Sequence, residues 1–293
     1  MGATDQLQVW DALEGKTFLI CVGAAKCATS WLHHYLGSLP EVAVSPLKEI
    51  HFFDAKFSAH ALGDMEGLAT ARLAYHLEQP GDTAANLRAW PSFRASLDRV
   101  QMIYDNNAYL AHFARLCTPA TRAFCDLTPS YSAIGPEGFA YMKWFCSTQK
   151  FRLRILFLMR DPVDRLWSQL RHLQQMKPAN DVAVKWPRAL DSAAIQARAD
   201  YRGIVSTLDT TFPAEDIQYL FYETLFAEAS LRRLCEFIGV PYRPGDATEI
   251  RNRTSVTLPL PEDARAAFHA QLAPQYAFCR DRFGGEVPTE WRH

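Results

Sequence analysis

The sequence predicts an α/β fold in which a central parallel sheet lies between two layers of helices. Short apolar runs alternate along the 293 residues with longer segments of helical periodicity, a pattern typical of parallel strands joined by helical crossovers. The run at 152–160 is almost continuously apolar, as expected for a strand that is buried on both faces. We find no repeat, low-complexity tract or clear linker, so a single domain spanning residues 1–293 is expected.

The first half of the chain is expected to supply three strands. Residues 17–22 (TFLICV) form a short apolar run that ends at Gly23, and a helical pattern then continues to just before Pro40. The remaining predictions for this half are a strand at 42–45, a mixed polar and aromatic connector at 48–54, a mainly helical segment at 55–118 and a strand near 121–127.

The second half repeats the alternation of strand and helix. A helix is predicted to begin at Pro162 with Asp161 as its cap, and another to close at Gly239. The remaining predictions are a helix over 136–147, helical segments over 188–212, a strand at 216–225, and a helical tail over 261–283 that is interrupted at Pro274.

Composition limits the classes of function. The formal net charge is −1, whereas a general nucleic-acid binder is usually basic, so any anionic ligand must be held by locally placed cations. The seven cysteines show neither CxxC nor Cys/His ligand spacing, which predicts free thiols in a reducing cytosol and no metal site. The chain does not start with a signal-peptide pattern, and no apolar run approaches the ~18 residues of a membrane span, so a cytoplasmic location is expected.

The loop after the first predicted strand has the features of an anion site. A strand that turns tightly into a helix presents free backbone N–H groups and the positive end of the helix dipole. Lys26 adds a charge, and Thr29 and Ser30 add hydroxyl groups. The loop does not fit the ATP-binding pattern G-x-x-x-x-G-K-[ST], because Ala28 and Thr29 occupy the second Gly and the Lys positions. The alternative is an ordinary strand–turn–helix unit with a solvated lysine.

A second candidate anion site lies in RDPVDRLWSQLRH, residues 160–172. Arg160 is expected at the carboxyl end of the buried strand, where open α/β sheets bind their ligands. Arg165, Ser168 and His172 fall on a different face of the following helix from its apolar stripe. Arg160 and Ser168 could therefore hold one phosphate. The alternative is a capped amphipathic helix with a solvated basic face.

Together, these two motifs resemble those of the sulfotransferases that use 3'-phosphoadenosine 5'-phosphosulfate (PAPS). VGAAKCATSWLHHYL is similar to their 5'-phosphosulfate loop, and RDPVDRLWSQLRH is similar to their 3'-phosphate motif. Further similar segments occur in the expected order: SPLKEIHFFD (45–54), LTPSYS (127–132), FYETL (221–225) and LCEFIGV (234–240). The resemblance covers most of the chain and leans toward the bacterial and glycan-modifying branch. It implies a P-loop-like fold of three layers.

The resemblance also implies roles for particular residues. Glu49 corresponds to a catalytic base, and His51 is a second candidate for which a structural role is equally open. Lys26 would stabilise the charge that grows toward the leaving 3',5'-ADP. The residues implied to bind PAPS are Lys26, Cys27, Ala28, Thr29, Ser30, Trp31, Arg160 and Ser168, with Arg251 and Arg253 carried over more loosely from a basic loop. Trp31 could instead pack in the core.

Two departures from the family pattern concern the donor loop and the acceptor. Ala28 stands where the family usually has Gly, and Leu127 stands where glycosaminoglycan enzymes commonly have Lys. An apolar Leu127 suits a highly anionic polysaccharide less well, so the acceptor is expected to be a less charged sugar, a lipid or a small metabolite. Two other functions remain open from the residues alone: an ATP-dependent kinase and a non-catalytic nucleotide-binding protein.

Overall fold

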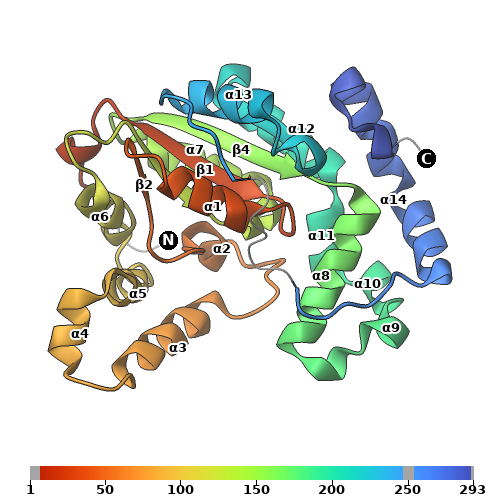
Figure 1. Cartoon of the computed structure of the whole chain (residues 1–293), viewed down its shortest axis with the longest axis horizontal. Helices are drawn as coiled ribbons and strands as arrows, with labels where there is room; N and C mark the ends of the chain where they lie inside the picture. The colour runs from red at the N-terminus through yellow and green to blue at the C-terminus, as the bar shows by residue number, and fades with distance from the viewer. Residues whose placement is uncertain (1–6, 247–253, 292–293) are drawn as a thin grey trace.

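The computed structural model describes residues 7–246 and 254–291. Its centre is a five-stranded parallel sheet with strand order β2-β3-β1-β4-β5. The strands are β1 (Thr17–Gly23), β2 (Val42–Val44), β3 (Ala123–Leu127), β4 (Arg152–Met159) and β5 (Ile217–Phe221). Helices lie on both sides of the sheet (Figure 1), which confirms the predicted α/β fold.

The strand order places a topological switch at β1. The chain passes from β1 to β2 and β3 on one side and then crosses to β4 and β5 on the other side. At such a point the connections leave the carboxyl edge in opposite directions, and this opens a crevice for ligands. The loops that follow β1, β3 and β4 all begin at this edge.

The helices account for most of the remaining chain. Their bounds are α1 (Thr29–Gly37), α2 (Phe52–Lys56), α3 (Met65–Leu77), α4 (Thr83–Ala89), α5 (Pro91–Gln101), α6 (Asn107–Leu116), α7 (Gly135–Ser147), α8 (Pro162–Met176), α9 (Val182–Lys185), α10 (Arg188–Asp191), α11 (Ala193–Ala199), α12 (Tyr201–Thr211), α13 (Glu228–Ile238) and α14 (Glu262–Phe283). Short 3-10 helices occur at 11–13, 129–133, 178–180, 214–216, 222–224, 284–286 and 289–291.

Two of the sequence predictions for these elements were wrong. The connector at 48–54 contains the start of a helix, α2, rather than irregular chain alone. The C-terminal helix α14 is not interrupted at Pro274 but runs through it. A proline removes one helical hydrogen bond, and the buried stripe that includes Phe268, Leu272 and Tyr276 packs on both sides of that position, which keeps the helix continuous.

The core is rich in aromatic side chains that join the sheet to the helices beneath it. Phe18 of β1 stacks on Phe124 of β3 with ring centroids 4.4 Å apart, and it also contacts Tyr109 of α6. Tyr109 in turn stacks on Phe52 of α2 at 4.2 Å. The α2 segment is thereby attached to the sheet, which places the residues just before it at the carboxyl edge.

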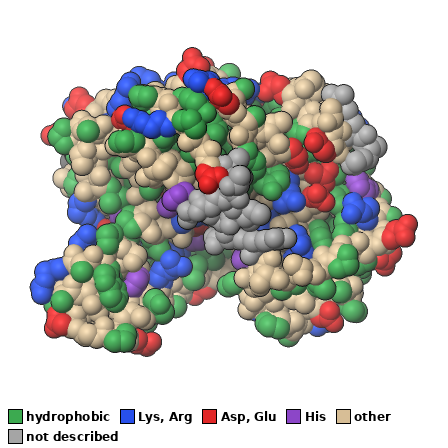
Figure 2. Space-filling model, in the orientation of Figure 1, with side chains coloured by type: hydrophobic (Ala, Val, Ile, Leu, Met, Phe, Trp, Pro, Cys, Tyr) green, Lys and Arg blue, Asp and Glu red, His purple; other side chains and the backbone are tan. Residues whose placement is uncertain are grey.

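Two groups of helices project beyond the sheet. Helices α3, α4 and α5 form one projection, and the far end of α8 with α9 and α10 forms the other (Figure 1). The space-filling view shows an indentation between these two lobes (Figure 2). Within the described residues, none of the helices is both long and apolar enough to cross a membrane.

Candidate active site

A cleft of about 850 Å³ opens at the carboxyl edge of the sheet. Its walls come from the loop after β1, the 48–54 segment, the 3-10 turn after β3, and helices α8 and α11. The sequence-predicted site residues that line it are Lys26, Ala28, Thr29, Ser30, Trp31, Glu49, His51, Arg160 and Ser168. Residues predicted from motifs far apart in the sequence therefore meet in one cavity of the size that binds small molecules.

The loop after β1 turns into helix α1 through two residues with left-handed backbone. Lys26 has φ 72° and Ala28, the cap of α1, has φ 58°. Helix α1 then starts at Thr29, so its first backbone N–H groups and its positive dipole end lie at the loop. This is the geometry of an anion site. Lys26 Nζ reaches Thr254 Oγ1 at 3.1 Å, which places its charge on the cleft wall.

The left-handed conformation of Ala28 is one that favours Gly, and it yields a stability prediction. A left-handed non-glycine residue costs roughly 1–2 kcal/mol, and Gly avoids this cost but loses roughly 0.5–1 kcal/mol of backbone entropy. The free energy of unfolding of Ala28→Gly is therefore expected to equal or slightly exceed that of the wild-type protein. Ala28→Val should lower it by about 1–2 kcal/mol. Chemical denaturation measures both.

Ala25→Gly is the matched control for this prediction. Ala25 lies in the same loop but is not among the described residues with positive φ, so the change brings no strain relief and should destabilise the protein. If Ala25→Gly and Ala28→Gly lowered the free energy of unfolding equally, the conformation of Ala28 would carry no strain.

The predicted second anion site lies beside this loop. Arg160 follows β4, and its Nη1 donates to the backbone oxygen of Lys26 at 3.4 Å while its guanidinium lies over the ring of Tyr222 at 4.6 Å. Asp161 caps α8 by accepting from the backbone N–H of Asp164, as predicted. Ser168 lies two turns along α8 and lines the same cleft. Arg160 and Ser168 thus converge with Lys26 on one cavity.

The alternative of a solvated basic face on α8 does not describe this helix. Arg165 is fully buried and donates from Nη1 to Gln169 Oε1 at 2.6 Å. His172 lines the cleft, and burial together with the charge of Lys26 lowers its pKa, which favours its neutral form. The polar face of α8 is therefore turned into the protein and the cleft.

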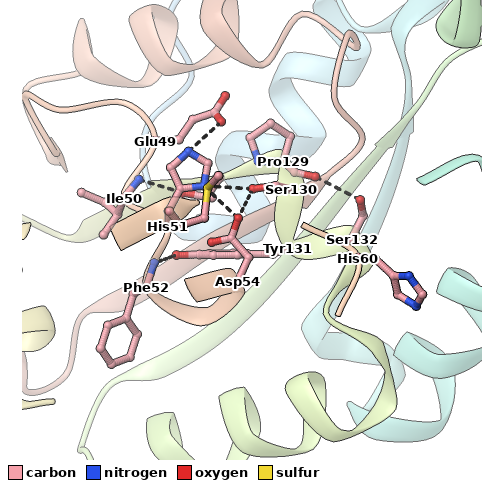
Figure 3. Close-up of polar contacts among 12 residues, drawn as sticks. Glu49, Ile50, His51, Phe52, Asp54, His60, Pro129, Ser130, Tyr131 and Ser132 are labelled. Atoms are coloured by element: carbon pink, nitrogen blue, oxygen red, sulfur yellow. Dashed lines mark hydrogen bonds and ion pairs between the residues drawn. The ribbon is translucent and has the colours of Figure 1, made fainter. Parts of the chain in front are cut away.

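Glu49, His51 and Asp54 form a series of polar contacts in the wall of the cleft (Figure 3). His51 Nδ1 lies 2.8 Å from Asp54 Oδ2, and His51 Nε2 lies 3.4 Å from Glu49 Oε2. Exposure of the side chains falls from 29% for Glu49 to 11% for His51 and 5% for Asp54. Glu49 therefore offers its carboxylate to the cleft, and His51 and Asp54 lie behind it. Lys48 Nζ also contacts Glu49 Oε1 at 2.8 Å, so the carboxylate of Glu49 is paired with a lysine as well.

The role of Asp54 was not predicted from the sequence, although Asp54 lies within the SPLKEIHFFD segment. Its Oδ2 accepts a hydrogen bond from Ser130 Oγ at 2.5 Å as well as facing His51 Nδ1. A carboxylate that faces one ring nitrogen fixes the tautomer and the orientation of a histidine. Asp54 and Ser130 therefore orient His51 with Nε2 toward Glu49.

A buried acidic hub holds this segment in place. Asp126, at the end of β3, accepts hydrogen bonds from the hydroxyl groups of Tyr109, Thr128 and Tyr131 at 2.7, 2.6 and 2.9 Å. Tyr131 in turn accepts from the backbone N–H of Phe52 at 3.0 Å. Burial raises the pKa of Asp126, and the three hydroxyl donors oppose this shift. The hub thus anchors the backbone beside His51.

Thr128 makes the second of these anchors. Its Oγ1 accepts from the backbone N–H of Ile50 at 3.0 Å while it donates to Asp126. Thr128 and Tyr131 therefore hold the backbone on both sides of His51, which has a left-handed φ of 57°. This explains physically why the segments SPLKEIHFFD and LTPSYS occur together: the second supplies the side chains that fix the first.

The remaining residues that were predicted to bind PAPS differ in how far their side chains are buried. Cys27 is fully buried, and burial raises the pKa of its thiol to about 12, so only its backbone can face a ligand. Trp31 is 4% exposed, stacks on Tyr35, and donates from Nε1 to the backbone oxygen of Asp246 at 2.8 Å. Packing thus accounts for most of the Trp31 surface, although its edge lines the cleft. Arg251 and Arg253 lie outside the described residues.

In residues 7–246 and 254–291, no group of three or more His, Cys, Asp or Glu side chains is arranged to hold a metal ion. The positive charge of the cleft comes from Lys26, Lys48, Arg160, Arg171 and Arg198.

Comparison with known proteins assigns the family. A model of the sulfotransferase family matches residues 19–244, which is most of the chain. The chain belongs to the sulfotransferase family. No match was found among curated proteins.

One of the three solved structures reported below has a TM-score high enough to show that the fold is shared. This sulfotransferase aligns with the crystal structure of a sulfotransferase from Alicyclobacillus acidocaldarius with a TM-score of 0.62 and 22% identity, over 94% of this chain and 98% of that chain. The sulfotransferase domain of the Synechococcus PCC 7002 olefin synthase aligns with a TM-score of 0.46 and 18% identity, over 92% and 98% of the two chains. The sulfotransferase domain from the curacin biosynthetic pathway aligns with a TM-score of 0.47 and 15% identity, over 89% and 98%.

Proposed function

We propose that this sulfotransferase transfers a sulfuryl group from PAPS to a hydroxyl or amine acceptor by in-line displacement, with Glu49 as the general base. The observation that supports this most directly is that a cationic loop and the Glu49–His51–Asp54 series line one cleft. The loop suits an anionic donor, and the series suits removal of a proton from an acceptor.

The donor end would divide the anionic groups of PAPS between two elements. The backbone N–H groups at the start of α1, with Lys26, Thr29 and Ser30, would bind the 5'-phosphosulfate, and Arg160 and Ser168 would bind the 3'-phosphate. PAPS supplies the sulfuryl group and leaves as 3',5'-ADP. Lys26 is placed to neutralise the negative charge that grows on the bridging oxygen of the leaving phosphate.

The acceptor end would manage one proton. A carboxylate oxygen of Glu49 takes the proton of the acceptor hydroxyl. At the same time the hydroxyl oxygen of the acceptor bonds to sulfur, and the bond from sulfur to the phosphate oxygen of PAPS breaks. His51 Nδ1 lies 2.8 Å from Asp54 Oδ2, and its Nε2 faces Glu49 Oε2 at 3.4 Å. His51 can then stabilise the protonated form of Glu49, which makes it a positioning residue rather than the base.

The kinase alternative is less consistent with the loop. The lysine of an ATP loop directly precedes a hydroxyl residue that binds Mg²⁺, whereas here Thr29 occupies that lysine position and Lys26 lies three residues earlier. The non-catalytic alternative leaves the Glu49–His51–Asp54 series without a role.

An acceptor screen tests the proposed reaction. The protein is incubated with PAPS and a panel of alcohols, phenols, amines, lipids and sugars, and the products are analysed by mass spectrometry. Transfer of a sulfuryl group to at least one acceptor, with release of equal 3',5'-ADP, is the expected result. A protein that binds 3',5'-ADP but transfers nothing to any acceptor would favour the non-catalytic alternative.

The environment of Lys26 yields a pH prediction. Burial and the neighbouring charges of Arg171, Arg160 and Lys48 lower the pKa of Lys26, whereas a bound anion would raise it. The affinity for 3',5'-ADP should therefore fall as the pH rises through the pKa of Lys26 in the free protein, below the pH at which an ordinary lysine loses its proton. Calorimetry as a function of pH measures this fall and the accompanying proton uptake.

Lys26→Arg is the control for the pH prediction, because an arginine stays protonated throughout this range. Its affinity for 3',5'-ADP should be almost independent of pH. The same alkaline fall in both proteins would assign the titration to another group.

A further inference from the structure

The side chain of Arg198 is a cation in the cleft wall whose charge is not paired. Arg198 lies in α11, is 5% exposed and lines the same cleft as Glu49 and Asp54. Among the described residues, no carboxylate lies within 4.0 Å of its guanidinium. A buried charge without a partner is costly, so a ligand that supplies the opposite charge would gain the energy that the free protein lacks.

Hydrogen bonds fix one edge of the guanidinium and leave the other available. Nη1 donates to the backbone oxygens of His60 at 2.5 Å and Ala194 at 2.8 Å. Nε and Nη2 form the other edge; in the part of the chain that the structure describes, neither has a hydrogen-bond acceptor and neither is sealed from solvent. Two parallel N–H groups match the two oxygens of a carboxylate.

Arg198 belongs to the acceptor end of the cleft. The charges that act on it are those of Asp54, Arg165 and Glu49. The charges that act on Lys26 are those of Arg171, Arg160, Glu49 and Lys48, so Glu49 acts on both cations. Burial lowers the pKa of Arg198 to about 10, which leaves it protonated at neutral pH.

Asp54 is the obvious protein partner for Arg198, but the two are not paired. Asp54 Oδ2 is occupied by His51 and Ser130, and Oδ1 is buried without a hydrogen bond among the residues described. Two backbone oxygens hold Nη1 of Arg198, which lines the cleft, and Arg198 forms no ion pair with Asp54 among the residues described.

We propose that Arg198 binds a carboxylate of the acceptor, which makes the acceptor class a hydroxy acid. Leu62, Met65 and Leu173 line the same cleft and would contact an apolar body between the hydroxyl and the carboxylate. This inference rests on the proposed function, because that function assigns the acceptor to the Glu49 end.

Binding of matched acids and amides tests the proposal without requiring turnover. The protein saturated with 3',5'-ADP is titrated by calorimetry with 4-hydroxybenzoate against 4-hydroxybenzamide, and with 6-hydroxyhexanoate against 6-hydroxyhexanamide. The acid of at least one pair should bind at least about tenfold more tightly than its amide. Arg198→Gln should remove this preference while 3',5'-ADP still binds.

Two further variants make the result decisive. Arg202→Gln removes the same charge from an exposed position on the adjoining helix α12 and should leave the preference unchanged. Arg198→Lys keeps the charge but lacks the two parallel N–H groups, so it should weaken binding of the acid by about threefold or more. This variant keeps the proposal testable even if Arg198→Gln fails to fold.

The possible failures are distinguishable. Equal binding of acid and amide, no binding of any pair, or a preference that survives Arg198→Gln would overturn the assignment of Arg198. A wild-type protein that does not bind 3',5'-ADP would instead refute the proposed function.

Discussion

Glu49→Gln is expected to lower kcat for sulfuryl transfer by about 10²–10⁴-fold, the usual contribution of a positioned general base. Gln keeps the shape of the side chain but cannot take a proton. Glu49 is the most exposed member of its series and acts on Lys26 only through its charge, so the affinity for 3',5'-ADP should change far less than kcat. Single-turnover kinetics and calorimetry measure the two quantities separately.

The variants His51→Asn and Asp54→Asn separate the base from the residues that position it. Both should slow turnover less than Glu49→Gln, because His51 and Asp54 act through Glu49. If His51→Asn abolished turnover while Glu49→Gln retained most of it, His51 would be the base, and the assignment made from the resemblance would be wrong.

Asp126→Ala is expected to lower the free energy of unfolding by roughly 3–5 kcal/mol. The change leaves the buried hydroxyl groups of Tyr109, Thr128 and Tyr131 without their shared acceptor. It also releases the two side chains that hold the backbone beside His51, so the variant that remains folded should lose turnover as well. Denaturant unfolding and initial rates measure the two effects.

Tyr109→Phe and Tyr131→Phe provide a matched pair for this hub. Each removes one hydroxyl that donates to Asp126, so both should destabilise the protein by about 1–2 kcal/mol. Only Tyr131 also accepts from the backbone N–H of Phe52, so only Tyr131→Phe should reduce kcat strongly. Equal kcat values for the two variants would show that the hub does not position the catalytic segment.

The sequence was informative wherever a short segment carried its own physical signal. The apolar runs at 17–22 and 152–160 predicted buried strands, and Asp161 and Gly239 predicted helix ends, because each of these preferences is local. The convergence of Lys26, Glu49, Arg160 and Ser168 on one cleft also follows from local information, since the carboxyl ends of parallel strands meet at one edge.

Other features depended on contacts between distant segments and could not be predicted locally. Helix α14 continues through Pro274 because packing on both sides of the proline outweighs its missing hydrogen bond. The orientation of His51 depends on Asp54 and on Ser130, which lies 79 residues from His51 in the chain. The unpaired charge of Arg198 is apparent only once α11 packs beside the loop at His60.

Calorimetric titration of one protein preparation with 3',5'-ADP and with ATP plus Mg²⁺ tests the central claim most directly. If Lys26, the start of α1, Arg160 and Ser168 bind the donor as proposed, 3',5'-ADP should bind tightly without Mg²⁺. Arg160→Ala should weaken that binding by about tenfold or more, and ATP with Mg²⁺ should compete poorly. Tight, Mg²⁺-dependent binding of ATP with no binding of 3',5'-ADP would contradict the account.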